Sequence, residues 1–301
     1  MRSAELALGL DVGGTSSRAL VRDRAGAELG HGEAGGGNPN SHPPEHAALQ
    51  VQRAAAAALA DLDPARVRSA VLGMAGASAM ADPQVAAPFD AVWDRLGLGC
   101  RPRVVTDCEV AFAAGTAEPD GTVLIAGTGA IAARIGQHRL EATAGGHGWL
   151  LGDEGSAFWL GREAVRHALR ALEHRAPRDP LADRVLRELG AHDRNRVITA
   201  VNTAPPIHLA ELAPLVTASA REDAPAASDI VHRAAEHLAD TAAATRRTGD
   251  TSPIVLAGSL VDPANPVGEA LRAELTARTR AEPLSAGPGT TGAAWLATHR
   301  L

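Results

Sequence analysis

Two short glycine- and threonine-rich turns, each directly after an apolar segment, are the clearest functional motifs in this chain. The first is Asp11-Val12-Gly13-Gly14-Thr15, and the second is Ala126-Gly127-Thr128-Gly129. Glycine lets backbone N–H groups approach phosphate oxygens closely, and threonine hydroxyls add further donors. One such turn is weak evidence because strand–glycine–strand hairpins are common. Two of them, one at the start of each half, predict a duplicated phosphate clamp.

Asp11 stands at the end of the first apolar segment, directly before the first turn. A carboxylate in that place can hold Mg²⁺ through water, because Mg²⁺ retains much of its hydration shell. The alternative is that Asp11 only shapes the turn. We favour the metal site, since a chain without lysine must neutralise nucleotide phosphates with backbone donors and a cation.

The composition excludes several classes of protein. The chain of 301 residues has no lysine, which P-loop nucleotidases, protein kinases, pyridoxal-phosphate enzymes and Schiff-base aldolases all require. A net charge of −6 argues against nucleic acid as a partner. Two cysteines, Cys100 and Cys108, cannot form a disulfide framework. The sequence shows neither a membrane-length apolar run nor a secretory signal, so we expect a cytoplasmic protein without a membrane partner.

The order of apolar runs and turns predicts an α/β chain with a first domain at 1–118 and a second at 119–301. In the first we expect strands at 5–10, 17–22, 27–31, 67–73 and 103–106, and helices at 45–60, 84–96 and 108–115. In the second we expect strands at 122–126, 130–135 and 253–257, a helix at 157–174, and a helix at 229–247 between Ser228 as N-cap and Gly249. The terminal helix, about 290–301, is expected to pack back on the first domain.

Four motifs together resemble one family. They are Gly9-Leu10-Asp11-Val12-Gly13-Gly14-Thr15, Thr106-Asp107, Ile125-Ala126-Gly127-Thr128-Gly129, and the run from Gly145 to Ser156 that contains Gly152-Asp153-Glu154-Gly155-Ser156. In these motifs the chain is similar to the BadF/BadG/BcrA/BcrD ATPase family. That family belongs to the superfamily of actin-like ATPases and sugar kinases and includes the eukaryotic-type N-acetylglucosamine kinases. The resemblance covers nearly the whole chain and is weakest at 175–225.

The resemblance implies two actin-like (ribonuclease H-like) α/β domains, with ATP–Mg²⁺ and a sugar in the cleft between them. It implies phosphate contacts from Gly13, Gly14, Thr15 and Ser16, from Gly127, Thr128 and Gly129, and, on the adenosine side, from Gly258 and Ser259. Asp107 corresponds to the catalytic base. The implied sugar contacts are Asn38, Gly76, Asp107, Gly146, His147 and Asp153.

Several of these residues also have structural interpretations. Asp107 could be the N-cap of helix 108–115, and Asp153 and Glu154 could cap helix 157–174. Asn38 could be a turn former, and His147 could pack within its loop. Human-type kinases of this family carry Gly-Trp-Gly-His where this chain has Gly146-His147-Gly148-Trp149. The indole ring and the imidazole ring are therefore exchanged, and the identity of the sugar substrate is left open.

The expected function is an ATP-dependent amino-sugar kinase acting on N-acetylglucosamine, at O6, with glucosamine and N-acetylmuramic acid as alternative substrates. A second hypothesis is a redox ATPase that activates a dehydratase or reductase, but its iron–sulfur cluster needs thiolate ligands. Neither Cys100 nor Cys108 lies in a glycine-rich loop of the second domain. A third is a sugar sensor without activity, which the retained Asp107 and phosphate turns disfavour. The family resemblance also implies a homodimer.

Overall fold

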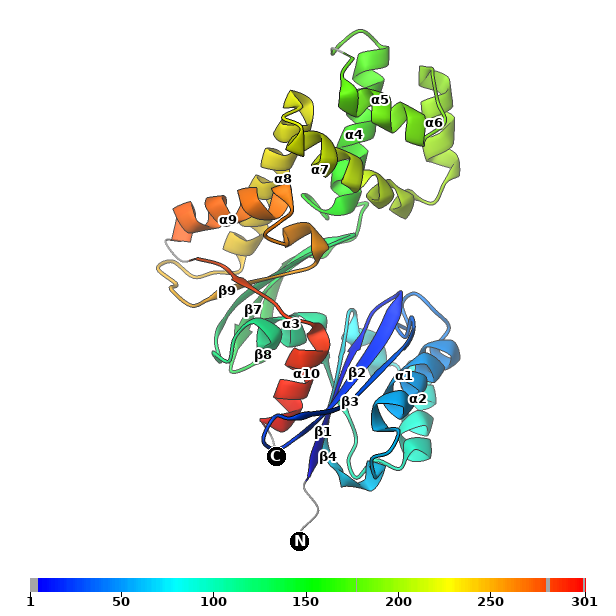
Figure 1. The fold of residues 1–301 in the computed structure, drawn as a ribbon, viewed down its shortest axis with the longest axis vertical. Coiled ribbons are helices and arrows are strands. Elements are labelled where there is room, and N and C mark those ends of the chain that lie inside the picture. Colours follow the sequence, from blue (N-terminus) through cyan, green and yellow to red (C-terminus); the bar gives the residue numbers. More distant parts are fainter. Residues whose placement is uncertain (1–4, 177, 280–281, 300) are drawn as a thin grey trace. The chain divides into compact units, whose positions relative to one another are not determined.

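The computed structural model describes residues 5–176, 178–279, 282–299 and 301 (Figure 1). The chain forms two compact units, each built around one five-stranded sheet. Unit 1 contains Met1–Pro119, Ile135–Leu140 and Ala286–Leu301, and unit 2 contains Asp120–Arg134 and Glu141–Ser285. The two sheets, both flanked by helices, confirm the predicted α/β class.

The sheet of unit 1 has the strand order β3-β2-β1-β4-β5. Its strands are β1 (Leu6–Val12), β2 (Ser16–Asp23), β3 (Glu28–Gly35), β4 (Val67–Met74) and β5 (Arg103–Thr106). β1 runs antiparallel to β2 and parallel to β4, and β4 runs parallel to β5. β1 therefore lies at the centre of the sheet, and its apolar run is buried on both faces.

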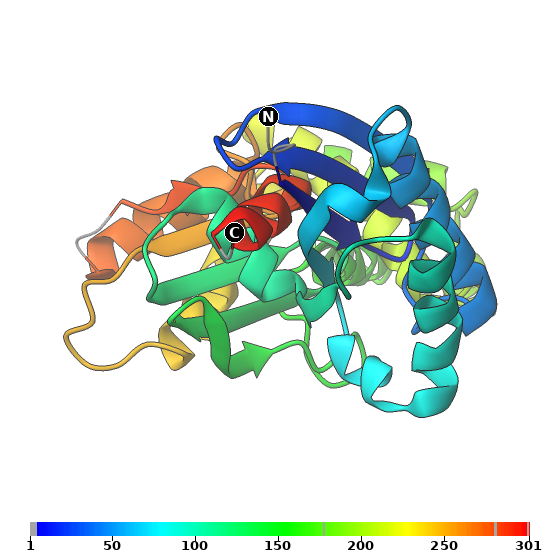
Figure 2. The same ribbon diagram turned by 90° about the horizontal axis from the view of Figure 1, so that it is seen from below.

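Helices cover both faces of this sheet, as Figures 1 and 2 show. On one face, α1 (Pro44–Leu59) and α2 (Pro83–Leu96) pack against alternate residues of β1 such as Leu8. On the other, α3 (Asp107–Gly115) and α10 (Gly289–Thr298) enclose a smaller apolar cluster. The short 3₁₀ helices η1 (Pro64–Arg66) and η2 (Ala77–Ala81) precede β4 and α2. The terminal helix α10 is thus part of unit 1.

The sheet of unit 2 has the strand order β10-β9-β6-β7-β8. Its strands are β6 (Gly121–Ala126), β7 (Ala130–Gly136), β8 (Arg139–Gly145), β9 (Ile254–Ala257) and β10 (Leu284–Ser285). Its helical elements are α4 (Ala157–Leu172), α5 (Pro180–Glu188), α6 (Arg194–Thr203), η3 (Pro206–Leu212), α7 (Ala213–Arg221), α8 (Pro225–Ala244), η4 (Ser259–Val261) and α9 (Pro266–Thr279). One large apolar cluster joins the sheet to α4, α7, α8 and α9.

The prediction for α8 is wrong at both ends. The helix begins at Pro225, so Ser228 lies inside it and is not its N-cap. It ends at Ala244, and Gly249, with a φ of 76°, lies in the turn beyond it. Proline at the first helical position is favourable because its missing N–H would be unpaired there anyway.

Several elements of unit 2 were absent from the sequence prediction, and β8 and α9 show why. β8 has only half-buried and exposed residues, so it lacks the apolar run that marks a strand. α9 buries Val267, Leu271 and Leu275 at helical spacing, a signal that was available in the sequence. Among the described residues, no helix combines the length and apolar character that crossing a membrane requires.

Candidate active site

The first phosphate turn, in unit 1, connects β1 to β2 and is held by the loop at 36–42. The Gly37 N–H donates to the Gly13 carbonyl at 3.1 Å, and the His42 Nε2 atom lies 2.6 Å from the Gly14 carbonyl oxygen. The Gly14 and Thr15 N–H groups have no acceptor in the described part of the chain. The turn therefore keeps its carbonyls engaged and leaves two backbone donors for an anion.

Asp11 lies on β1 in register with Arg18 of β2 and Gly73 of β4. Burial and the nearby Asp107 carboxylate raise the pKa of Asp11, while the Arg18 charge lowers it. The first residue of α10, Gly289, packs directly on this carboxylate, because a Cβ there would lie 2.6 Å from the Asp11 Cγ atom. Two mutually repelling carboxylates thus lie together in unit 1, an arrangement that a divalent cation would relieve.

Asp107 is the first residue of α3 and follows β5 directly. Burial raises the pKa of its carboxyl group, and the Cys108 N–H, which donates to Oδ1 at 3.0 Å, partly opposes this. A raised pKa makes a carboxylate a better general base near neutral pH.

The capping alternative for Asp107 is wrong. Thr106 is the N-cap of α3, and it forms a capping box with Glu109: Thr106 Oγ1 accepts from the Glu109 N–H at 3.3 Å, and Glu109 Oε2 accepts from the Thr106 N–H at 2.8 Å. Asp107 is therefore not the N-cap of α3, although its Oδ1 accepts from the first-turn Cys108 N–H. The buried Glu109 carboxylate belongs to the capping box.

Asn38 is only 6% exposed, and backbone groups engage both ends of its amide. Nδ2 donates to the Ala75 carbonyl at 3.1 Å, and Oδ1 accepts from the Asn40 N–H at 2.8 Å. Gly76, with a φ of 65°, begins the turn after β4, and the Asn40 side chain packs against it. The turn-forming interpretation of Asn38 therefore has direct structural support, and Asn40, which the sequence analysis passed over, lies beside two predicted sugar contacts.

The second phosphate turn, in unit 2, lies between β6 and β7 against the start of α4. The Gly127 and Thr128 carbonyls accept from the Ala157 and Phe158 N–H groups at 2.9 and 3.2 Å. The Thr128 and Gly129 N–H groups have no acceptor in the described residues. As in the first turn, carbonyls are engaged and two donors are left for an anion.

Ser156, not Asp153 or Glu154, is the N-cap of α4, because its hydroxyl accepts from the Trp159 N–H at 3.2 Å. The capping alternative for those two acids is therefore wrong. Asp153 instead turns toward the second phosphate turn, where its Oδ1 accepts from the Ala130 N–H at 3.1 Å. Glu154 pairs with Arg162 at 3.1 Å.

The glycine-rich segment before α4 turns repeatedly through the left-handed region, with positive φ at Gly145, Gly146, Gly148, Asp153 and Gly155. His147 is exposed and packs against Gly152, whose added Cβ would lie 3.1 Å from the His147 Cβ.

The remainder of that segment carries exposed apolar side chains. The Trp149 ring lies 5.9 Å from the Phe158 ring, and Leu150 and Leu151 are mostly exposed.

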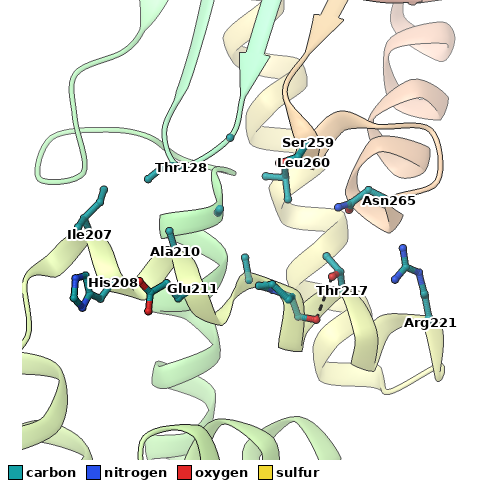
Figure 3. Close-up of a pocket in the computed structure, with 14 residues that line it drawn as sticks. Thr128, Ile207, His208, Ala210, Glu211, Thr217, Arg221, Ser259, Leu260 and Asn265 are labelled. Carbon is teal, nitrogen blue, oxygen red and sulfur yellow. Dashed lines mark hydrogen bonds between the residues drawn. The ribbon is translucent and has the colours of Figure 1, made fainter. Parts of the chain in front are cut away.

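A pocket of about 660 Å³ opens beside the second phosphate turn (Figure 3). Thr128 and Ser259 lie along one side, and Glu211, Thr217 and Arg221 lie along the other. The volume is that of a typical small-molecule site. Gly258, with a φ of 101°, packs on the Ala126 carbonyl and so brings Ser259 next to the turn.

The far wall of this pocket comes from residues 207–221, the part of the chain where sequence reasoning found no site. The pocket joins two predicted groups, Gly127–Thr128 and Ser259, within unit 2. In unit 1, the structure brings Asp11, Asp107 and the first turn into one neighbourhood. In the described residues, no group of three or more His, Cys, Asp or Glu side chains could hold a metal ion alone.

These features define an actin-like nucleotide-binding protein, and comparison with known proteins agrees. The chain belongs to the BadF/BadG/BcrA/BcrD ATPase family, whose sequence profile matches residues 8–297. Membership of this ATPase family implies that the chain binds ATP.

Two curated relatives are sugar kinases. The chain is 29% identical over 197 residues to the N-acetyl-D-glucosamine kinase of Dictyostelium discoideum, which covers 62% of this chain and 61% of the relative. It is 31% identical over 115 residues to the N-acetylmuramic acid/N-acetylglucosamine kinase of Clostridium acetobutylicum. The matched segment covers 38% of this chain and 37% of that relative. The matched segments therefore span less than two thirds of either relative.

A solved structure extends the likeness over the whole chain. It is that of a candidate N-acetylglucosamine kinase from Chromobacterium violaceum, with a TM-score of 0.79 and 27% identity, and it covers 98% of this chain and 99% of that one. The fold is therefore that of two actin-like domains, and the family resemblance inferred from the motifs is confirmed.

Proposed function

We propose that this protein is an ATP-dependent amino-sugar kinase that transfers the γ-phosphoryl group of ATP to O6 of N-acetylglucosamine. The observation that carries the proposal is Asp107, a carboxylate of raised pKa that is not the N-cap of its helix and lies close to Asp11. A carboxylate of this kind can accept the proton of a sugar hydroxyl, which is the step that a sugar kinase requires.

The nucleotide has a site suited to it in unit 2. The pocket beside Thr128 and Ser259 has the size of a nucleoside site. The unpaired N–H groups of the turns Gly13–Ser16 and Gly127–Gly129 supply phosphate donors. Asp11 fits a magnesium site, because its carboxylate is destabilised by burial and by Asp107, and this lysine-free chain offers no ammonium in its place. Bound Mg²⁺ would neutralise the charge of the phosphates.

The residues of unit 1 would carry out the proton transfer. The Asp107 carboxylate accepts the hydrogen bond of the sugar hydroxyl and takes its proton as the oxygen–phosphorus bond forms. The bond from the γ-phosphorus to the bridging oxygen breaks, and ADP leaves with that oxygen. Phosphoryl transfer depends mainly on positioning and charge stabilisation, and a positioned base adds about 10²–10⁴-fold.

The remaining sugar contacts follow the family pattern. We propose that Asn38, Gly76, Gly146 and His147 face the sugar, with Asn40 as an addition from its packing on Gly76. Asn38 can take part only with the hydrogen-bonding capacity left after its two backbone bonds. Glucosamine and N-acetylmuramic acid are the alternative substrates.

A coupled assay for ADP release with a panel of amino sugars tests the proposal. We expect sugar-dependent turnover, fastest with N-acetylglucosamine. Equal ADP release with and without every sugar would contradict a kinase. A coloured purified protein with iron–sulfur absorption would instead support the redox activator.

A further inference from the structure

Asp153 lies where its carboxylate can fix the second phosphate turn. Its backbone has a φ of 56°, a left-handed conformation that Asp and Asn tolerate better than most residues. This conformation returns the side chain to the start of β7, where Oδ1 accepts from the Ala130 N–H at 3.1 Å. Ala130 directly follows the last glycine of the turn.

The turn and the carboxylate fit each other closely. A Cβ added to Gly129 would lie 2.8 Å from Asp153 Oδ2 and 2.9 Å from Oδ1, closer than real Cβ atoms approach an oxygen. By contrast, a Cβ added to Gly127 would meet nothing within 4 Å. The close fit is therefore specific to the glycine beside Asp153.

The peptide unit between Gly129 and Ala130 is held at both ends. Its carbonyl accepts from the Gly127 N–H at 2.9 Å, and its N–H donates to Asp153. The preceding carbonyls of the turn are held by the start of α4. With these groups fixed, the free Thr128 and Gly129 N–H groups have one orientation, which is the condition for preorganised anion binding.

We propose that Asp153 is a positioning residue of the nucleotide site, which holds the Gly127–Gly129 turn so that its N–H groups face the phosphates of ATP. This differs from the sugar contact that the family resemblance implies, and it rests on the proposed nucleotide binding. Glu154, the adjacent carboxylate, has no such role, because it is 45% exposed and pairs with Arg162.

Calorimetric titration of the full chain with ADP tests this inference. Asp153→Gly removes the carboxylate without straining the left-handed backbone and should weaken ADP binding at least about tenfold, a factor equivalent to about 1.4 kcal/mol. Asp153→Asn retains an acceptor for Ala130 and should stay within about threefold of the wild type. Glu154→Gln is the matched control and should not change the affinity.

A double-mutant cycle tests the contact between Asp153 and Gly129. Gly129→Ala should weaken ADP binding strongly in the wild type but add less than about threefold in the Asp153→Gly protein, because the opposing carboxylate is gone. Purely additive effects would overturn the inference. So would unchanged ADP affinity in Asp153→Gly together with a raised KM for N-acetylglucosamine, which would assign Asp153 to the sugar. If the wild type did not bind ADP at all, the proposed function would fall as well.

Discussion

Gly9, in the middle of β1, is the residue on which the packing of α10 most directly depends. A Cβ at this position would lie 2.6 Å from the Ala294 Cα and 2.7 Å from the Ala293 carbonyl carbon, with the Ala294 nitrogen closer still. Ordinary contact begins at 3.4 Å. The Ala294 Cα alone would have to retreat by about 0.8 Å, and the nearer Ala294 nitrogen requires a larger shift of the helix. Backbone atoms cannot rotate away as a side chain can.

The Gly9→Ala variant should therefore lose much of the stability of unit 1. Overpacking of this kind costs about 1–3 kcal/mol, and a clash with backbone belongs at the upper end. For a unit of this size, about 3 kcal/mol corresponds to a decrease in Tm of roughly 6–12 °C. Because the first residue of α10 packs on Asp11, the shift should also reduce turnover.

Differential scanning calorimetry, with Gly13→Ala as the control, measures this effect. The added methyl group in Gly13→Ala meets only the Ser16 carbonyl oxygen at 3.6 Å, an ordinary contact. Its Tm should stay near that of the wild type, although it alters a phosphate turn. A Gly9→Ala protein with the Tm of the wild type would refute the packing of α10 on β1.

Three further predictions concern carboxylates and caps. Asp11→Asn should raise the Tm of the nucleotide-free protein at pH 7 while lowering turnover. Burial and Asp107 raise the pKa of Asp11 in the folded state, so the charged carboxylate destabilises the fold increasingly as pH rises above about 4. The gain in Tm should therefore vanish in more acidic buffer. Glu109→Gln should keep kcat near the wild-type value, since that side chain serves the capping box; a hundredfold loss in the coupled assay would make Glu109 the base. Thr106→Ala should lower the unfolding free energy by about 0.5–2 kcal/mol in urea titration, and no loss would contradict the assigned N-cap.

The sequence predicted the central strands well because each contains a short apolar run and is followed by a turn with glycine. β1, β4 and β6 were located within a residue or two on that basis. The N-cap at Thr106 could also have been found, since Thr106-Asp107-Cys108-Glu109 fits the capping-box pattern. Two adjacent residues able to cap a helix compete there, and the extended backbone of Thr106 decides between them.

Other parts of the site depend on contacts between distant segments. The wall of the unit 2 pocket formed by Glu211, Thr217 and Arg221 follows from the packing of η3 and α7 beside η4, which no local pattern indicates. The contact of Asp153 with Gly129 joins residues 24 positions apart, and it depends on the left-handed backbone of Asp153. Short motifs predicted candidate site residues but not which partner each side chain contacts.

The central claim is that Asp107 is the base of a sugar kinase, and kcat of Asp107→Asn tests it most directly. Asp82→Asn is the matched control, since Asp82 caps α2 in the same unit and Asn caps equally well. We predict that Asp107→Asn has a Tm no lower than that of the wild type, since burial disfavours the charged carboxylate. It should keep its affinity for N-acetylglucosamine but lose at least about a hundredfold in kcat, because an amide cannot take the hydroxyl proton. Turnover near that of the wild type and of Asp82→Asn would contradict the assignment of Asp107 as the base.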